Sequence, residues 1–346
     1  MSSQTRILSY SLAINEGLHQ MMARDRSVFV IGQGVKSPWY VGNTCRDLLE
    51  TFGPARVMDT PVSENAVTGA AVGAAIAGMR PVVVHPRMDF MMYAIDPIVN
   101  EAANWHYMCG GRLPVPVVIW GIVNRGGEQA AQHSQSLHAW FAHVPGLKVV
   151  MPSTPHDAKG LMVAAIRDPN PVVFIDDRWL HDIEGPVPER LYSVPIGRAA
   201  IRCLGSDVTL ASTSYMSVET VKAADALHRE DIKADVIDLR TIKPLDETLL
   251  MRSVQKTGRL LVVDGGWRTC GFAAEVAALV SESAFSALKA PVRRLTLPDV
   301  PAPASRSLEE AYYTDWRDIT RAAKRLVRGN HPIRNHRWTQ IRGTKN

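Results

Sequence analysis

Short and almost uninterrupted apolar runs alternate with amphipathic segments over the first 180 residues. The runs are VFVIG (28–32), RPVVVHP (80–86), VPVVIWGIV (115–123), LKVVMPS (147–153) and PVVFID (171–176). Helical patterns lie between them at 64–79, 89–109 and 154–167. Runs with so little polar alternation are typical of parallel strands that are covered on both faces. The order β-α-β-α predicts a doubly wound α/β domain.

A second alternation of strands and helices follows a stretch rich in proline and glycine near residues 185–197. The pattern predicts strands at 207–213, 233–242, 259–265 and 291–297, with helices at 214–230, 246–257 and 271–284. We therefore expect two domains with a linker between them and a tail without apolar periodicity after the second. The expected boundaries are 1–185, a linker at 186–205, a smaller α/β domain at 206–328, and a tail at 329–346.

The positive charge of the chain is concentrated at its end. The 346 residues include 39 Lys and Arg against 34 Asp and Glu, a formal net charge of +5. The last 19 residues hold five of the positive residues and no acidic one, so the first 327 residues are formally neutral. A neutral body offers no surface that neutralises many phosphates, which excludes nucleic acid as the main partner. We expect the tail to be a partner-facing extension.

The sequence predicts a cytoplasmic protein with no membrane span. The four cysteines are scattered without a C-x-x-C spacing, so neither a disulfide framework nor a thiolate zinc site is expected. No apolar run approaches the roughly 18 residues that a membrane span needs. The N-terminal segment lacks the long apolar stretch of a secretory signal.

The segment 58–84 is the first candidate for chemistry. A strand ends near Asp59, and a helix of mostly Ala and Gly begins around Glu64. An acidic residue in the first turn of a helix is stabilised by the helix dipole, whether or not it takes part in a reaction. Both interpretations stay open from the residues alone. The small side chains of this helix predict close approach by another helix or by a second subunit.

Two further candidates follow later strands. His133 lies in a loop after the run 115–123, and Phe90 lies near the start of the segment 89–109. His133 can be a catalytic residue or an ordinary hydrogen-bonded loop histidine, and Phe90 can be a core residue or a platform for a flat heterocycle. His133, His138 and His143 are five residues apart. This spacing turns each by about 140° on a helix, which excludes a shared zinc site.

The chain carries no recognisable diphosphate site of its own. The glycine-rich segments 32–38 and 264–271 match neither the G-x-G-x-x-G pattern nor a Walker loop. The sequence also lacks a GDG followed by paired asparagines, the arrangement that holds a magnesium diphosphate. If the protein uses a diphosphate cofactor, another chain must hold its diphosphate.

A series of motifs in a fixed order resembles one enzyme family. The motifs are DTPVSE, GAAVGAAIAGMRPVVV, MDF-x-x-x-AID-x-IVNEAA, QHSQSLHAWFAHVPGLKVVMPSTPHDAKGL, DVIDLRTIKPLD and DVPAPASRSLEEAYY. They resemble the beta subunit of the thiamine-diphosphate-dependent decarboxylating component of 2-oxo-acid dehydrogenase complexes, of the pyruvate, acetoin and branched-chain type. The resemblance runs from about residue 5 to residue 327, and 132–161 is its most specific stretch.

The resemblance implies a fold, a reaction and partners. It implies a thiamine-binding pyrimidine-type doubly wound domain followed by the smaller α/β C-terminal domain of transketolases. It also implies an α2β2 enzyme in which the alpha subunit holds the magnesium and diphosphate of thiamine diphosphate. The enzyme would decarboxylate a 2-oxo acid and pass the acyl fragment to a lipoyl-bearing acyltransferase or to another carrier thiol, such as an acyl carrier protein.

The resemblance assigns roles to the three candidate residues. Glu64 matches the glutamate that hydrogen-bonds a ring nitrogen of the aminopyrimidine, which suits a buried carboxyl with a raised pKa. Phe90 matches the aromatic residue stacked on the pyrimidine, and His133 matches the histidine near the reacting carbon.

The resemblance also implies a structural potassium ion in the loop that contains IRDPNP. Asp168 and Asn170 match this loop, with main-chain carbonyls around Ala165 completing the site. A simple turn explains the same residues.

The chain departs from the family pattern at several points near the implied site. Gln33-Gly34 replaces two carboxylates, and His85-Pro86-Arg87 replaces an acidic or apolar run. Trp120 stands where many relatives have Arg. A site that has lost acid and gained base favours a more anionic donor, which we expect His85 and Arg87 to contact. Drift in the residues around the site, without any change of donor, explains the same departures.

These departures leave three hypotheses for the function. The leading one is the 2-oxo-acid dehydrogenase beta subunit. The alternative is a split transketolase-like transferase that moves a two-carbon ketol unit from a phosphorylated ketose to a carrier protein or an aldehyde. The presence of Glu64, Phe90 and His133 together argues against a third, a non-catalytic scaffold.

Overall fold

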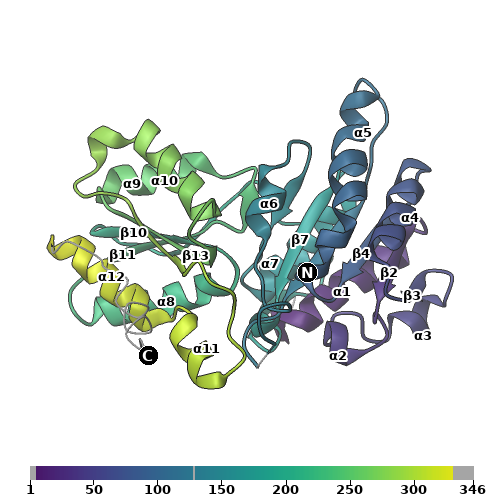
Figure 1. Cartoon of the computed structure of the whole chain (residues 1–346), viewed down its shortest axis with the longest axis horizontal. Helices are drawn as coiled ribbons and strands as arrows, with labels where there is room; N and C mark the ends of the chain where they lie inside the picture. Colours follow the sequence, from purple (N-terminus) through teal and green to yellow (C-terminus); the bar gives the residue numbers. More distant parts are fainter. Residues whose placement is uncertain (1–4, 128, 330–346) are drawn as a thin grey trace, which may run out of the picture. The chain divides into compact units, whose positions relative to one another are not determined.

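The computed structural model describes residues 5–127 and 129–329, which form two compact units. The first unit takes in the chain up to Arg125 together with His133–Arg198 and Arg240–Pro244. The second unit is made of Gly126–Gln132, Ala199–Leu239 and the chain from Leu245 onward. Figure 1 shows the helices and strands of both units.

The first unit is built on a seven-stranded sheet with the order β12-β6-β7-β5-β4-β2-β3, in which only the edge strand β12 is antiparallel. All residues of β5 and β7 are buried, which explains their uninterrupted apolar runs. The doubly wound sheet predicted from the sequence is confirmed. Its strands are β2 (Val28–Gln33), β3 (Val57–Thr60), β4 (Arg80–His85), β5 (Val118–Val123), β6 (Lys148–Val150), β7 (Val172–Asp177) and β12 (Thr241–Lys243).

Helices follow most of these strands, as the alternating pattern predicts. The predicted helix at 89–109 forms as three successive pieces, because a 3-10 turn and a π-helical turn precede its α-helical end. The helices of the first unit are α1 (Tyr10–Arg24), α2 (Pro38–Val41), α3 (Leu48–Phe52), α4 (Glu64–Ile76), η1 (Met88–Ala94), η2 (Asp96–Ala102), α5 (Ala103–Met108), α6 (His138–His143), α7 (Pro155–Arg167) and η3 (Arg178–Leu180).

The structure corrects the predicted linker at 186–205. Strand β8 (Glu184–Pro188) pairs with β1 (Thr5–Ser9) in an antiparallel ribbon, so the start of this segment belongs to the first unit. Strand β9 (Ala200–Cys203) at its other end joins the sheet of the second unit. Proline and glycine lie at edge strands here as well as in loops, so their presence alone does not identify a linker.

The predicted strand at 233–242 is also corrected, because it divides between two sheets. Its first part is β11 (Ala234–Asp238), and its last part is β12, which pairs with β6 of the first unit. Between them Arg240 adopts a left-handed conformation with φ +54°, and its carbonyl accepts a hydrogen bond from the backbone of Met151. The apolar pattern at 233–242 indicates which residues are buried but not which strand they pair with. It therefore gave no sign that the segment is divided between two sheets.

The second unit contains a five-stranded sheet with the order β14-β13-β10-β11-β9, antiparallel only at β9. This smaller α/β domain agrees with the sequence pattern, which did not predict α11 and α12. The remaining elements are β10 (Val208–Ser212), β13 (Leu260–Trp267), β14 (Arg293–Leu297), α8 (Ser214–His228), α9 (Glu247–Thr257), α10 (Phe272–Ser283), η4 (Phe285–Ala287), α11 (Arg306–Tyr312) and α12 (Trp316–Arg328).

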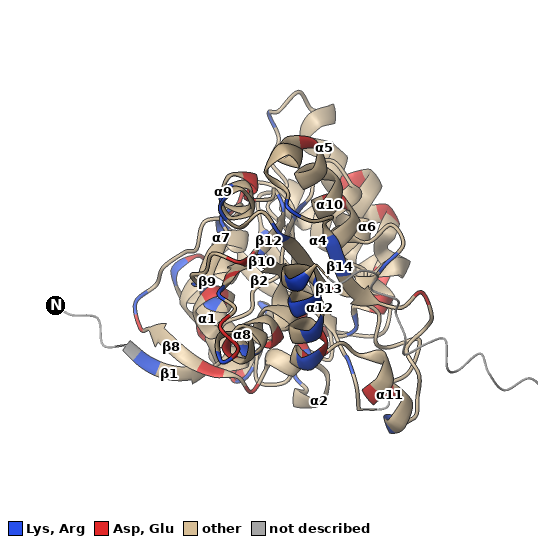
Figure 2. Cartoon of the chain, turned by 90° about the vertical axis from the view of Figure 1, so that its left-hand side faces the viewer, with Lys and Arg blue, Asp and Glu red and all other residues tan. Residues whose placement is uncertain are grey.

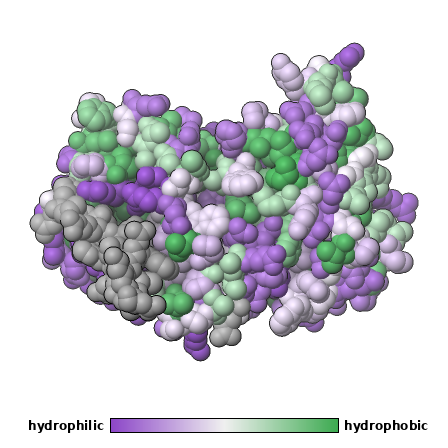
Figure 3. Space-filling model, in the orientation of Figure 1, coloured by the Kyte–Doolittle hydropathy of each residue, from purple (hydrophilic) through white to green (hydrophobic). Residues whose placement is uncertain are grey.

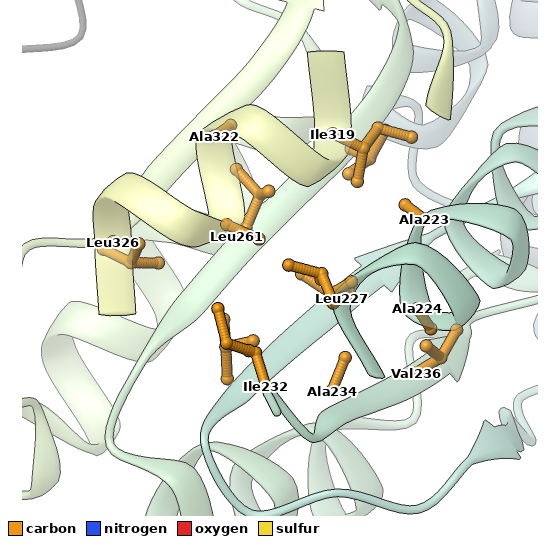
Figure 4. Packing of buried hydrophobic residues seen from close by; sticks show 14 of the residues in the cluster. Ala223, Ala224, Leu227, Ile232, Ala234, Val236, Leu261, Ile319, Ala322 and Leu326 are labelled. Carbon is orange, nitrogen blue, oxygen red and sulfur yellow. The ribbon is translucent and has the colours of Figure 1, made fainter. Parts of the chain in front are cut away.

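The core of the second unit lies where α8 and α12 cover the sheet (Figure 4). Ile319, Ala323 and Leu326 of α12 follow each other at helical spacing and are all buried. They pack with Leu227 of α8 and with Leu261 of β13 in one cluster. The helix begins at a capping box on Asp315, which satisfies backbone amides of its first turn.

The outer face of α12 is basic (Figure 2). Lys324 and Arg328 form ion pairs with Glu230, and Arg321 pairs with Asp318 of its own helix. The basic tail predicted from 329 therefore follows a helix that is already rich in Lys and Arg. Residues 330–346 of that tail lie outside the described residues.

Across residues 5–127 and 129–329, no helix is both long enough and apolar enough to cross a membrane.

We expect Ile319→Ala to destabilise the second unit by about 2 to 5 kcal/mol, because it leaves a cavity in a fully buried cluster. Ile319 is 0% exposed, whereas Ile201 on the edge strand β9 is 46% exposed. Ile201→Ala is therefore a matched control that should change stability by less than about 0.5 kcal/mol. Urea unfolding followed by circular dichroism measures both, and equal effects would contradict the packing of α12 on the sheet.

Candidate functional site

The candidate site lies at the carboxyl ends of β2, β3 and β4. Strand β2 sits between β3 and β4, so the chain leaves it toward β3 on one side and returns on the other side at β4. Such a change of direction in a parallel sheet opens a crevice at the carboxyl ends of the strands. The pocket found there is lined by Gln33, Thr60, Pro61, Ser63, Glu64, Val67, Val84, His85, Pro86, Arg87 and Phe90.

Glu64 enters this pocket as the first residue of α4. It is half-buried, and Ser63 before it makes no side-chain cap. Thr60, at the end of β3, has a buried Oγ1 with no hydrogen-bond partner among the described residues. The pocket therefore presents two groups that can hydrogen-bond a ligand, a carboxyl and a hydroxyl, on neighbouring elements.

The small residues of α4 leave one face of the helix open. Ala66, Ala70 and Ala77 are exposed, and a Cβ added at Gly69 or Gly73 would meet nothing within 4 Å. The close approach of another helix that the sequence predicts for this face is sterically allowed. No such partner lies on it among the described residues of this chain.

The Gln33-Gly34 departure has a backbone reason. Gly34 has φ +68°, and a Cβ at this position would lie 2.5 Å from the ring of Tyr40. Its amide donates a hydrogen bond to Asp59 Oδ1 at 2.7 Å, which ties the end of β2 to β3. A larger residue is disfavoured here both by conformation and by space. The loss of one carboxylate therefore reflects the turn and the ring packed on it.

His85 does not bring a positive charge to the site, contrary to the expectation from the sequence. Its side chain is buried and its Nε2 lies 3.2 Å from Thr68 Oγ1. Burial lowers the pKa of His85 to about 4, so the imidazole is neutral at physiological pH. Arg87 is half-buried. Its burial and, to a lesser extent, the positive charge of the nearby Arg178 lower the pKa of its guanidinium. A guanidinium nevertheless stays charged at physiological pH.

Trp120, the other departure on this side of the sheet, lies in the core. It is fully buried in β5, and its ring packs edge-on against Phe174 with centroids 6.1 Å apart. It does not line the pocket. Its replacement of an Arg found in many relatives therefore acts through packing.

The structure brings Phe90 and His133 together. Phe90 belongs to η1, directly after β4, and His133 belongs to the loop after β5. Their ring centroids are 5.4 Å apart and the rings are nearly perpendicular. Because Phe90 also lines the pocket with Glu64, the three candidates belong to one end of one sheet.

Among the described residues, no three or more His, Cys, Asp or Glu side chains lie together in a way that could hold a metal ion. His138 is buried and its Nδ1 lies 2.9 Å from Ser136 Oγ. His143 lies at the far end of the same short helix, α6. The three histidines do not form a cluster.

The loop expected to hold potassium is already contacted by two cations. Lys148 Nζ donates to both carboxylate oxygens of Asp168 at 2.8 and 2.6 Å. Arg80 donates to the carbonyl oxygens of Ile166 and Asp168. Within the described part of the chain, Asn170 Oδ1 is buried without a hydrogen-bond partner. A potassium ion would have to use this oxygen and the carbonyl groups around Ala165, and not the Asp168 carboxylate.

The sequence reasoning missed Asp89. This residue is 5% exposed, and its Oδ1 accepts a hydrogen bond from the backbone amide of Gln135 at 3.0 Å. Burial raises the pKa of Asp89, and the hydrogen bonds from Gln135 and the nearby His133 act in the opposite direction. The signal for it was an acidic residue in a predicted apolar helix start, directly before Phe90.

Comparisons with known proteins cover both units. Residues 7–181 match the family described as "Transketolase, pyrimidine binding domain", and residues 197–319 match "Transketolase, C-terminal domain". The chain is similar to the acetoin:2,6-dichlorophenolindophenol oxidoreductase subunit beta of Cupriavidus necator, with 43% identity over 94% of this chain and 98% of that protein.

Other relatives and a solved structure agree with this match. The pyruvate dehydrogenase E1 component subunit beta of Rickettsia felis is 42% identical over 91% of this chain and 96% of that protein. The mitochondrial pyruvate dehydrogenase E1 component subunit beta-1 of Arabidopsis thaliana is 44% identical over 90% of this chain and 87% of that protein. A solved chain described as "Split gene transketolase, inactive beta4 tetramer" has a TM-score of 0.76 at 20% identity, over 93% of this chain and 98% of that one, which shows the fold.

We expect the folded protein to lose stability as the pH falls from 6.5 to 4, because His85 resists protonation in the folded state. The pKa of His85 falls from 6.5 in the unfolded chain to about 4 in the folded one, so only the unfolded state binds the proton in this window. Above pH 6.5 the neutral His85 costs the folded state nothing. As the pH falls from 6.5 toward 4, the free energy of unfolding decreases by about 3 kcal/mol in total.

The measurement is thermal unfolding across this pH range for the wild type and for His85→Asn. The variant lacks the titrating group and should lose less stability on acidification. Parallel curves for the two proteins would contradict a buried neutral His85.

Proposed function

This chain belongs to the family of beta subunits of pyruvate and acetoin dehydrogenases, as its two transketolase-type domains and relatives at 42 to 44% identity show, and from this membership we propose its function. The chain is the beta subunit of a thiamine-diphosphate-dependent enzyme that decarboxylates a 2-oxo acid. The family and the fold predicted from the sequence are thereby confirmed. The enzyme passes the acyl fragment to a lipoyl group or another carrier thiol.

One observation carries this proposal within the structure. Glu64 and Phe90 line the same pocket at the carboxyl ends of β3 and β4, and His133 contacts Phe90 from the loop after β5. These are the three residues to which the family resemblance assigns the aminopyrimidine contact, the stacking contact and the reacting carbon. Residues 64, 90 and 133 are far apart in the sequence, and only the strand order brings them to one place.

The lining of the pocket fits a flat heterocycle with a polar edge. Phe90, Val67 and Val84 supply apolar surface, whereas Glu64 and Thr60 Oγ1 supply hydrogen-bonding groups. Thiamine diphosphate, when bound, supplies the nucleophilic carbon that adds to the 2-oxo acid and accepts the electrons released with carbon dioxide. Glu64 binds the aminopyrimidine and moves a proton at its ring nitrogen. The magnesium and diphosphate are held by the alpha subunit.

The contact of His133 with Phe90 suggests a second role at this site. Its imidazole is half-buried and is placed against Phe90, so an aminopyrimidine lying on Phe90 would be next to it. If the cofactor is held there, the imidazole would be able to hydrogen-bond an oxygen of the substrate or guide the acyl fragment to its acceptor. We propose that role for His133.

The donor is a simple 2-oxo acid. Two of the three relatives named above are named after pyruvate, which is a 2-oxo acid. The third is named after acetoin, a hydroxyketone without a carboxylate, and none of the three is named after a phosphorylated sugar. His85 is buried and neutral, so it offers no positive charge to the phosphate of a ketose phosphate. Arg87, which lines the pocket, is the proposed contact for the carboxylate of the donor.

The partner is an alpha subunit in an α2β2 assembly, as the word "subunit" in the names of the relatives suggests. Two exposed surfaces of the first unit support this proposal. One is the open face of α4 around Gly69 and Gly73. The other is the end of α5, where Tyr107 is 87% and Met108 60% exposed, followed by Leu113 at 46%. Figure 3 shows hydrophobic (green) and hydrophilic (purple) residues interspersed over the face that it presents.

The acceptor is a lipoyl-bearing acyltransferase, with another carrier thiol as the second choice, and the compartment is the cytoplasm. The acceptor is proposed from the family resemblance. The compartment is proposed from the four scattered cysteines, whose spacing suggests no disulfide framework. All four cysteines are free thiols in the structure, and Cys45 is buried.

We expect Glu64→Gln in the reconstituted αβ enzyme to lower kcat by about 100-fold or more, because an amide cannot shuttle the proton. Reduction of 2,6-dichlorophenolindophenol with pyruvate or acetoin as the donor measures the activity. Glu247→Gln, at the exposed start of α9, is the matched control and should leave kcat unchanged. Unchanged turnover of Glu64→Gln, or turnover only with a ketose phosphate, would overturn the proposal.

We also propose that potassium binds at Asn170 Oδ1 and the carbonyl groups near Ala165. A ligand that binds only the folded state raises stability, so the melting temperature should be higher in potassium chloride than in choline chloride at equal ionic strength. Asn170→Ala should remove this difference, whereas the exposed Asn65→Ala should keep it. Equal melting temperatures of the wild type in both salts would show that Lys148 and Arg80 suffice.

A further inference from the structure

The residue that joins two of the site's segments is Asp89. It is the second residue of η1, between the fully buried Met88 and the pocket residue Phe90. Its carboxylate Oδ1 accepts the backbone N–H of Gln135 at 3.0 Å. Because η1 follows β4 and Gln135 lies in the loop after β5, this hydrogen bond connects the carboxyl ends of two neighbouring strands.

The segment held in this way contains His133. Gln135 is two residues from His133, and Ser134 between them is 3% exposed. Phe90, the residue next to Asp89, contacts the imidazole of His133 edge-on at a centroid distance of 5.4 Å. Two consecutive residues of η1 thus fix the same loop, one at its backbone and the other at its imidazole.

The turn that carries Asp89 is itself firmly anchored. Met88 and Met91 are both 0% exposed and pack against Gly121 of β5, where an added Cβ would lie only 2.4 Å from Met91 Sδ and in ordinary contact with Met88. A displacement of Asp89 would therefore require repacking of the sheet. The loop of His133, in contrast, includes exposed residues at Ala131 and Gln132. The hydrogen bond from Gln135 therefore ties the loop of His133 to the buried start of η1.

A buried carboxylate is a costly way to make this contact. Burial raises the pKa of Asp89, and the amide of Gln135 together with the nearby His133 offsets part of this cost. An acceptor that fixes a catalytic loop explains why a carboxylate is useful at this position. A role in packing alone would be served better by an apolar residue of similar size.

We propose that Asp89 is a positioning residue that holds the loop of His133 and so sets the imidazole against Phe90. The proposal rests on the function proposed above for His133. Asp89 itself does not touch the reacting atoms. It acts through the Gln135 amide, and an asparagine, which keeps an oxygen at the same position, satisfies the same role.

The first test measures the hydrogen bond directly in the αβ assembly, without activity. Amide hydrogen exchange of the peptide covering 129–137 should be at least about 10-fold faster in Asp89→Ala than in the wild type, because an amide exchanges once its hydrogen bond is lost. Asp89→Asn should keep the slow exchange. Asp96→Ala, an exposed acid on the adjacent η2, is the matched control and should not change it. Unchanged exchange in Asp89→Ala would overturn the proposal.

The second test asks whether Asp89 acts through His133. Asp89→Ala should lower kcat about 10- to 100-fold, the range expected from misplacing a catalytic group. Asp89→Asn should restore kcat to within about 3-fold of the wild type. In a His133→Ala background, Asp89→Ala should cost nothing further, because residues that act as a unit are not additive. Full additivity of the two losses would contradict a positioning role.

The two tests separate this inference from the proposed function. If His133→Ala leaves turnover unchanged, the function proposed for His133 fails, while the exchange experiment still decides whether Asp89 holds the loop. If His133→Ala strongly lowers turnover and exchange is unaffected by Asp89→Ala, only the inference about Asp89 fails. Should Asp89→Ala not assemble with the alpha subunit, Asp89→Ser, whose hydroxyl is too short to reach Gln135, takes its place.

Discussion

The pairing of β2 with β3 on one side and β4 on the other is the constraint on which the site depends. All three strands are parallel, so their carboxyl ends meet, and the change of direction at β2 opens a crevice between them. Into this crevice the chain brings Glu64 from the segment after β3 and Phe90 from the segment after β4. The hydrogen bond from Gly34 to Asp59 ties the ends of β2 and β3 at the same place. Without this strand order the candidate residues would have no common position.

Within the described part of this chain, the site is open on the side of α4. Glu64 is half-buried, and α4 beyond it offers a face of alanine and glycine with open space over Gly69 and Gly73. A helix of such small side chains gains little from burying itself and much from close contact with a partner backbone. An alpha subunit on this face would complete the enclosure of Glu64 and supply the diphosphate site that the sequence lacks. Burial of a carboxyl favours the uncharged form that can donate a hydrogen bond.

The departures from the family pattern take a different meaning in three dimensions. As charges along the sequence, the absent carboxylates and the added His85 indicate a more anionic donor. In the structure, Gly34 adopts a left-handed conformation next to the ring of Tyr40, which leaves no room for a side chain. Trp120 packs in the core against Phe174. His85 is neutral because its burial disfavours the charged form. Arg87 lines the pocket and keeps its positive charge, which is the reason for proposing it as the contact of a donor carboxylate.

The sequence by itself determined the fold class, the family and the three main candidate residues. Apolar runs report burial on both faces of a parallel sheet, and the ordered motifs place Glu64, Phe90 and His133. It did not reveal that the run 233–242 divides between two sheets, or that 186–205 contains strand residues, since periodicity does not name a pairing partner. Nor did it reveal the neutral state of His85 or the role of Asp89. Both depend on what surrounds a side chain, such as the Gln135 amide 46 positions away, and only the tertiary structure decides that.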